Sequence, residues 1–237
     1  MPADLRTRVA RLDWEAIERA LDAEGYAPTG RLLSAAECRD LASLYDDERR
    51  FRSRVDMQRL GFGRGEYKYF NRPLPRVVQG LRTNLYPRLA PIAARWAREL
   101  GQRRRFPPRL TEFLEVCARR DQRKPTPLML RYRTGDYNRL HQDIYGDVAF
   151  PLQFVSLLSR RGADYEGGEF LLVEQAPRAQ SKGTAIPLER GEGLVFTTRE
   201  RPVEGRRGHY RVNMRHGMSR VTAGERVALG VIFHDGA

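Results

Sequence analysis

Cysteine is scarce in this sequence. Only two cysteines occur in 237 residues, Cys38 and Cys117. Two such distant cysteines exclude a disulfide-stabilised scaffold and a zinc ribbon. Both lie in segments with a helical pattern, so we expect ordinary buried thiols.

Long apolar runs are also absent. No stretch approaches the roughly 18 to 20 residues that a membrane-spanning helix needs, and residues 1–21 contain no apolar core of the kind found in secretory signals. We therefore expect neither a transmembrane nor an exported protein, and a cytoplasmic location. Hydrophobic residues at 41% and charged residues at 31% indicate a folded globular chain of domain size.

Lysine is almost missing, although the chain is strongly basic. Of 43 Lys and Arg residues only three are lysines, which leaves 40 arginines against 30 acidic residues and a net charge of +13. Arginine suits phosphate recognition because its planar guanidinium forms bidentate hydrogen bonds. The runs Arg103-Arg104-Arg105 and Arg206-Arg207 could therefore contact nucleic acid. A GC-rich genome also over-supplies arginine, and charge runs commonly form a solvated face, so both interpretations stay open.

The pattern of the chain changes near residue 127. Residues 1–126 are predicted to be mainly helical, with a long stretch over 74–101 that forms either two helices or one kinked helix around its prolines. Residues 127–237 contain short β-rich runs separated by Gly, Asp, Asn and Pro, which is the spacing of an antiparallel sandwich or barrel. We expect one domain over 1–237, in which N-terminal helices support one face of a β-core.

A Gly-rich, aromatic segment over 61–73 interrupts the helical half. Tyr67 and Tyr69 alternate as in a strand, and Glu66 and Lys68 lie beside them. Interleaved basic and aromatic residues are typical of surfaces that bind single-stranded nucleic acid. The segment is interpreted either as a flap over a substrate or as an ordinary edge hairpin.

One short motif has the spacing of a metal site. His141 and Asp143 are two residues apart, and on extended backbone such side chains point to the same face. A second histidine from another strand, His216, would complete the 2-His-1-carboxylate facial triad of non-haem Fe(II) oxygenases. His-x-Asp alone more often marks a turn carboxylate beside a surface histidine. The metal interpretation gains weight because further elements follow in order.

Arg226 is the next of these elements. It follows His216 by ten residues, at the start of a β-rich run. A turn is expected between them, over 222–225. An arginine close to the metal could hold the distal carboxylate of a dicarboxylate cosubstrate through a bidentate ion pair.

Five motifs in this order make the C-terminal half similar to the Fe(II)/2-oxoglutarate-dependent dioxygenases, in the branch that contains the prolyl 4-hydroxylases. The likeness covers about 127 to 235. RYRTGDYNRLHQD resembles the family's Tyr-x-x-Gly-x-x-x-x-x-His-x-Asp stretch, with Tyr132, Gly135, His141 and Asp143 at the matching places. The other four are the Gly-Gly-Glu strand (165–174), the Gly-Glu-x-hydrophobic-x-Phe strand (191–196), the His-Gly segment (216–221) and the strand with the arginine (224–233).

The metal motif also resembles that of AlkB-type nucleic-acid dealkylases, which carry a similar Leu-His-Gln-Asp stretch. The segment after the distal histidine departs from that pattern, because it lacks the paired arginines and follows the prolyl-hydroxylase spacing. The whole chain is similar to a group of bacterial oxygenases proposed to act on damaged DNA.

The resemblance implies a fold and a reaction. The fold would be α+β, with a double-stranded β-helix core (a jelly-roll, cupin-like architecture) over 127–237, buttressed by the N-terminal helices. The reaction would couple oxidative decarboxylation of 2-oxoglutarate to C–H hydroxylation, with Fe(II), 2-oxoglutarate and O2 as cofactors and ascorbate as an accessory reductant. The implied metal ligands and catalytic residues are His141, Asp143 and His216, and the implied 2-oxoglutarate contacts are Arg226 and Tyr132.

Other polar residues have weaker assignments. His209 rivals His216 as the third ligand, but the two differ by seven residues and would face opposite ways on one strand. Only His216 is followed by the glycine and the arginine, so we expect His209 at the surface or in a substrate cleft. His234 is expected to be structural. Asn138, Gln153 and Asn213 are candidates to line a pocket.

Three functions remain open from the sequence. The first is a dioxygenase that demethylates alkylated nucleic acid, which binds through the arginine-rich surface. The second is a peptidyl-prolyl or small-molecule hydroxylase, favoured by the spacing after His216. The third is a non-enzymatic nucleic-acid-binding module on the same scaffold. No motif identifies the substrate or the oligomeric state.

Overall fold

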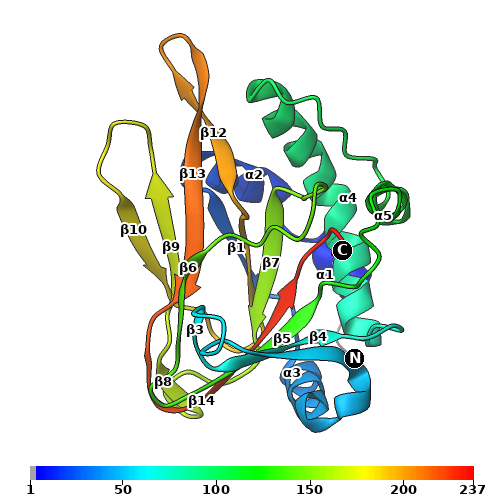
Figure 1. Cartoon of the computed structure of the whole chain (residues 1–237), viewed down its shortest axis with the longest axis vertical. Coiled ribbons are helices and arrows are strands. Elements are labelled where there is room, and N and C mark those ends of the chain that lie inside the picture. Colours follow the sequence, from blue (N-terminus) through cyan, green and yellow to red (C-terminus); the bar gives the residue numbers. More distant parts are fainter. Residues whose placement is uncertain (1–3) are drawn as a thin grey trace.

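The computed structural model describes residues 4–237. Two antiparallel sheets face each other, and helices cover the outer side of the first sheet (Figure 1). The helices are α1 (Leu5–Ala10), α2 (Trp14–Glu24), α3 (Ala35–Ser43), α4 (Arg76–Glu99) and α5 (Leu110–Ala118), with 3-10 turns at Leu44–Asp46 and Glu48–Arg50. No helix within residues 4–237 is long and apolar enough to cross a membrane.

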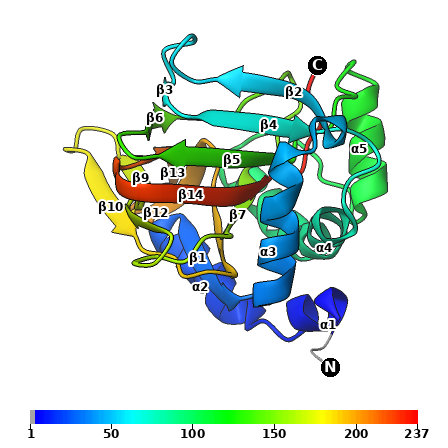
Figure 2. The ribbon, with the colours of Figure 1, turned by 90° about the horizontal axis from the view of Figure 1, so that it is seen from below.

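The first sheet contains eight strands, all paired antiparallel. The strand order in this sheet is β1 (Tyr26–Arg31), β11 (Glu192–Thr197), β7 (Leu152–Leu157), β14 (Val221–Val231), β5 (Leu128–Arg133), β4 (Glu66–Phe70) and β2 (Phe51–Asp56), and β8 (Tyr165–Gly167) pairs with β14. Figure 2 shows β2, β4, β5 and β14 side by side in this order.

The second sheet contains six strands. Its order is β10 (Lys182–Ile186), β9 (Phe170–Gln175), β13 (Gly208–Met218), β6 (Tyr137–His141) and β3 (Gly63–Arg64), and β12 (Glu200–Gly205) pairs with β13. From β5 to β14 the chain passes repeatedly from one sheet to the other. This winding produces the double-stranded β-helix expected from the sequence.

Most buried apolar residues form two clusters, one on each face of the first sheet, because side chains alternate between the faces along each strand. Side chains two residues apart point to the same face, so Phe154 and Leu229 pack outward against the helices. Their neighbours Val155 and Ala228 pack inward, against residues of the second sheet such as Met214. The helices therefore cover one face of the first sheet, and the space between the two sheets stays available for a site.

The residues before 127 contribute strands as well as helices. β1 extends one edge of the first sheet, while β4 and β2 extend the other. The stretch over 74–101 contains a single helix, α4 (Arg76–Glu99), with Pro87 and Pro91 inside it. Cys38 and Cys117 are free buried thiols, as expected.

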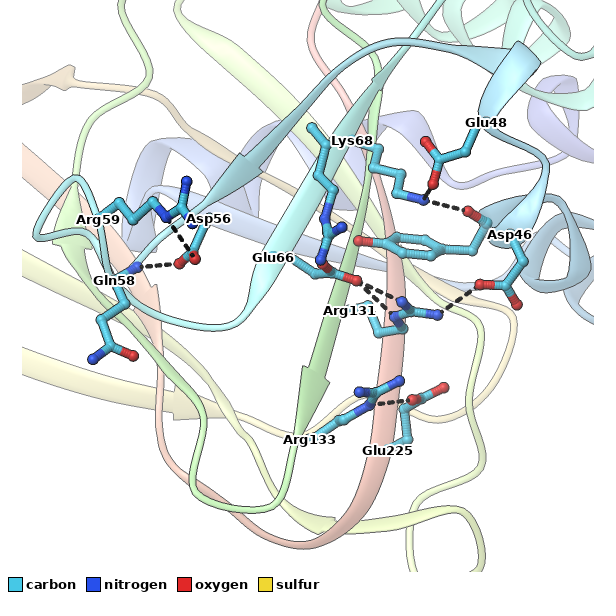
Figure 3. Close-up of polar contacts among 12 residues, drawn as sticks. Asp46, Glu48, Asp56, Gln58, Arg59, Glu66, Lys68, Arg131, Arg133 and Glu225 are labelled. Carbon is cyan, nitrogen blue, oxygen red and sulfur yellow. Dashed lines mark hydrogen bonds and ion pairs between the residues drawn. The ribbon is translucent and has the colours of Figure 1, made fainter.

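The segment 61–73 is part of a sheet hairpin rather than a free flap. β4 lies between β2 and β5, and Lys68 is buried, donating to the Tyr45 carbonyl (2.8 Å) and to Glu48 (2.6 Å). Glu66 accepts hydrogen bonds from Arg131 (2.6 Å) on β5 (Figure 3). Of the two interpretations left open by the sequence, the edge hairpin agrees with these contacts, because internal ion pairs occupy Lys68 and Glu66.

A buried ion pair connects the C-terminus to α4. Arg82 is 1% exposed and donates to the Ile232 and Phe233 carbonyls and to Asp235 (2.7 Å). Asp235 is also buried and contacts Arg72 (2.5 Å). Removing the carboxylate would leave a charged guanidinium in the interior without its partner.

We therefore expect Asp235→Ala to lower the free energy of unfolding by about 3–5 kcal/mol. Urea denaturation followed by circular dichroism measures the change. Asp147→Ala is the matched control, because Asp147 is exposed. Equal stability of the two variants would contradict a stabilising role for the Arg82–Asp235 pair.

Candidate active site

A cavity of about 420 Å³ lies between the two sheets. Strands β5, β7 and β14 form one wall, and β6 and β13 form the other. His141, Asp143, His216, Arg226 and Tyr132 all line it. The structure therefore brings together every residue of the site predicted from the sequence.

Three possible metal ligands lie close together in this cavity. His141 is the last residue of β6 and pairs in register with His216 on β13. Asp143 follows just beyond the strand, with its carboxylate 3.5 Å from His141 Nε2 and 3.2 Å from His216 Nε2. The candidate donor atoms all lie within 4.8 Å of one another.

Neighbouring groups orient these side chains. His141 Nδ1 is 2.7 Å from the Arg139 carbonyl, so a proton on Nδ1 directs the lone pair of Nε2 towards Asp143. The Tyr145 hydroxyl donates to Asp143 Oδ1 (2.7 Å). Sequence reasoning missed Tyr145, although it repeats the i, i+2 spacing of the motif.

The pKa shifts of Asp143 and His216 suit a cation. Burial raises the pKa of Asp143, but hydrogen bonds and charge from His141 and His216 outweigh burial and hold the pKa well below its usual value. Burial lowers the pKa of His216, and the charge of His141 lowers it further. For His141, burial lowers the pKa, and Asp143 more than compensates and raises it. An ionised carboxylate beside a neutral imidazole is the donor state that divalent metals require.

The donor set fits non-haem iron. Two imidazole nitrogens and one carboxylate oxygen would occupy three adjacent coordination positions of an iron ion. The other positions of the ion would stay open to other ligands. The residues point into a cavity rather than into a closed core. This open arrangement distinguishes the group from a structural zinc site, in which four protein ligands enclose the ion.

Arg226 lies elsewhere in the same cavity. It is 3% exposed, and its Nε has no hydrogen-bond partner among residues 4–237. A buried guanidinium that has no carboxylate beside it is unfavourable unless an anion pairs with its charge. Tyr132 is its register partner on β5, and burial raises the pKa of Tyr132, so its hydroxyl stays protonated.

The Gly-Gly-Glu motif packs against this arginine. Gly168 has φ +61, and a Cβ there would lie 2.9 Å from the Arg226 Cδ. Gly167 has φ +70, and a Cβ at this position would collide with the Arg220 carbonyl. Glycine at both positions allows β8 to approach β14 closely.

One local prediction is wrong. The expected turn over 222–225 is absent, because these residues belong to β14, and the chain reverses at Ser219 and Arg220 instead. Gly224, with φ +76, packs closely on the Asp164 carbonyl at the irregular pairing of β14 with β8. A glycine with positive φ therefore marks a strand irregularity here and not a hairpin.

The remaining polar residues singled out from the sequence lie in different parts of the structure. Asn138 and Gln153 line the cavity, whereas Asn213 is exposed outside it. His209 lies on the β12–β13 hairpin, 4.0 Å from Glu99. His234 is fully buried and accepts from the Phe150 amide, and burial lowers its pKa to about 4. The structural interpretation of His234 agrees with these contacts.

Comparisons with known proteins identify the family. A family model described as an oxygenase catalysing oxidative methylation of damaged DNA matches residues 65–236. Two uncharacterised Mycobacterium tuberculosis proteins, from strains CDC 1551 and H37Rv, are each 53% identical over 165 residues, which is 70% of this chain and 71% of theirs.

Solved structures support the fold. A Pseudomonas putida prolyl-4-hydroxylase matches with a TM-score of 0.54 at 14% identity, covering 94% of this chain and 100% of that chain. The non-heme α-ketoglutarate-dependent epimerase SnoN matches with a TM-score of 0.57 at 13% identity, covering 92% and 81%. The chain therefore belongs to the Oxygenase-NA family, whose model describes an oxygenase, and its fold is that of these solved structures.

Proposed function

We propose that this oxygenase demethylates alkylated bases in nucleic acid, with its iron held by His141, Asp143 and His216. The observation that carries the proposal is one cavity lined by the possible metal ligands, by a buried arginine, Arg226, that has no ion-pair partner among residues 4–237, and by exposed apolar side chains and an exposed arginine. The description of the family model, which names damaged DNA, supports the substrate class.

The three ligands would present one face to the ion. His141 and His216 donate Nε2 and Asp143 a carboxylate oxygen, and Tyr145 restrains that carboxylate through its hydroxyl. When bound, iron and 2-oxoglutarate supply the oxidising capacity that inserts one atom of O2 into a C–H bond. The apolar wall of the cavity, with Phe170 and Phe196 packed against His216, excludes water from the reacting atoms.

Arg226 would hold the distal carboxylate of 2-oxoglutarate. Its guanidinium provides the bidentate geometry that carboxylates prefer, and Tyr132 adds a protonated hydroxyl nearby. Asn138 donates to that hydroxyl (3.2 Å), which fixes its direction. The residues therefore bind and orient the cosubstrate between the sheets.

Gly168→Ala tests this assignment. The new Cβ would press on the Arg226 side chain, so we expect the KM for 2-oxoglutarate to rise about 10-fold. Gly162→Ala is the matched control, because Gly162 has a similar φ of +73 but no atom within 4 Å of the position that a Cβ would occupy. Initial rates of succinate release measure KM, and equal KM values for the two variants would contradict contact of Arg226 with the cosubstrate.

The rim of the cavity suits a nucleobase. Phe62, Leu140 and Ile144 are exposed by 46%, 42% and 41% and line the cavity. Arg139, which precedes Leu140, is also exposed and lines the cavity. Aromatic and apolar side chains stack with bases, while arginine binds phosphate. An unpaired base could therefore enter the cavity with its backbone on the rim.

The overall reaction is balanced by its cosubstrates. Hydroxylation converts the N–CH3 group to N–CH2OH, while 2-oxoglutarate and O2 yield succinate and CO2. The N–CH2OH group then loses formaldehyde and leaves N–H. Each methyl group removed therefore releases one formaldehyde and one succinate.

Release of formaldehyde is the direct test. The protein, loaded anaerobically with Fe(II) and 2-oxoglutarate, is exposed to O2 with methylated or unmethylated single-stranded DNA. We expect formaldehyde and additional succinate only with the methylated strand. Succinate release that is indifferent to DNA would reject demethylation and favour a peptide or small molecule as the substrate.

A further inference from the structure

A second cavity lies beside the cavity between the two sheets, which is called the catalytic cavity below because it holds the proposed metal ligands. Its volume is about 240 Å³. The segment 142–147 separates the two, because Asp143 lines the first, Gly146 lines the second and Ile144 lines both. A strand leaving the catalytic cavity over the exposed Ile144 would therefore reach the second cavity directly.

The interior of the second cavity is aromatic. Trp96, Phe106 and Phe150 line it. Phe106 is half-buried and packs edge-on to Phe150 with ring centroids 5.3 Å apart. Aromatic surfaces stack with any nucleobase, since every base has a π-face.

Two arginines lie on the edge of this cavity. Arg104 and Arg199 are both exposed, and neither guanidinium forms an ion pair with a residue in 4–237. Arg104 is also the middle residue of an exposed arginine run. Of the acidic lining residues, Glu200 pairs with Arg211 (2.8 Å) and Asp147 is exposed. The unpaired guanidinium groups suit a phosphate.

The wall of the second cavity is connected to the possible metal ligands. Gln142 lies between His141 and Asp143, and its amide donates to the carbonyls of Arg199 (3.2 Å) and Met214 (2.8 Å). The position of Arg199 relative to the catalytic cavity is therefore fixed by the same three-residue motif. A ligand that spans both cavities would be held in register with the reacting atoms.

From this arrangement we infer that the second cavity binds the nucleotide next to the methylated one in single-stranded DNA. The neighbouring base stacks on Phe106, and its phosphate contacts Arg104 and Arg199. The inference rests on the proposed demethylation and narrows its substrate class, because a strand fills both cavities whereas a free nucleotide fills one.

Substrate length tests the inference. We expect kcat/KM for formaldehyde release to be about 10-fold or more higher with a methylated single-stranded pentanucleotide than with the methylated nucleoside monophosphate. The double variant Arg104→Ala/Arg199→Ala should lose most of that advantage. Arg119→Ala/Arg120→Ala removes the same charge from exposed positions at the end of α5, outside both cavities, and should retain it.

Binding supplies a readout that does not depend on turnover. Fluorescence anisotropy of the labelled pentanucleotide, under anaerobic conditions with Fe(II) and 2-oxoglutarate, gives Kd as a function of salt. In Arg104→Ala/Arg199→Ala, the slope of log Kd against log salt should fall by about 0.7 for each phosphate that is no longer neutralised by an arginine. In Arg119→Ala/Arg120→Ala it should stay as in the unmodified protein.

The outcomes separate the two proposals. Equal kcat/KM for the nucleotide and the pentanucleotide, or equal losses in both double variants, would overturn the subsite and leave demethylation standing. If no DNA releases formaldehyde but pentanucleotide binding depends on Arg104 and Arg199 alone, the subsite stands and demethylation is rejected.

Discussion

His216→Ala is expected to reduce 2-oxoglutarate turnover by at least about 100-fold, because losing a metal ligand should exceed the 10- to 100-fold effects of outer-shell changes. The side chain lies 3.2 Å from Asp143 in the catalytic cavity, and no other histidine within residues 4–237 lines that cavity except His141. The loss should appear first in Fe(II) affinity, measured by anaerobic equilibrium dialysis, and then in succinate release.

His209→Ala is the matched control for this prediction. His209 lies on the same strand, β13, but outside the cavity and near Glu99. Its replacement should leave Fe(II) affinity within about two-fold, since it contacts no proposed ligand. Because His216 is buried, thermal unfolding of the metal-free variants separates loss of metal from loss of fold. Tight Fe(II) binding by a folded His216→Ala protein would exclude this residue as a ligand.

The proposed catalytic cavity was largely predictable, because the sequence patterns that indicate it are local. His141 and Asp143 are two residues apart, and the strand that carries His141 ends at this residue, where the motif leaves the sheet. His216 and Arg226 lie on consecutive strands, β13 in the second sheet and β14 in the first, and only Ser219 and Arg220 connect these strands, so the spacing along the chain limits where the two side chains can lie. Strand alternation then directs these side chains to the interior.

Features that depend on distant partners were not predictable in the same way. β1 has the sequence YAPTGR, which contains proline and glycine and little apolar pattern, and it forms a strand because β11 is available as its partner. Lys68 has the context of a nucleic-acid contact, yet Tyr45 and Glu48 bury it. The second cavity is assembled from α4, the loop after it, the segment after Asp143 and β12, which no local pattern connects.

Arg226→Met should raise the Kd for 2-oxoglutarate by about 30-fold or more, since loss of one member of a buried ion pair costs about 2–5 kcal/mol. Methionine removes the charge and retains much of the volume, so the sheet around Tyr132 should stay packed. Arg215→Met is the control, because Arg215 is exposed on β13 and does not line the cavity. Isothermal titration with the Fe(II)-loaded protein under anaerobic conditions measures both Kd values.

The same substitution distinguishes a cosubstrate anchor from a structural arginine. In the protein without ligand, Arg226 is a buried cation whose Nε has no hydrogen-bond partner among residues 4–237. Replacing an unpaired buried cation with an apolar side chain removes the cost of keeping that charge away from water. We therefore expect the free energy of unfolding of ligand-free Arg226→Met to be equal or higher, while 2-oxoglutarate no longer stabilises the variant. A clear loss of stability without ligand, with unchanged 2-oxoglutarate affinity, would instead make Arg226 a structural residue of β14.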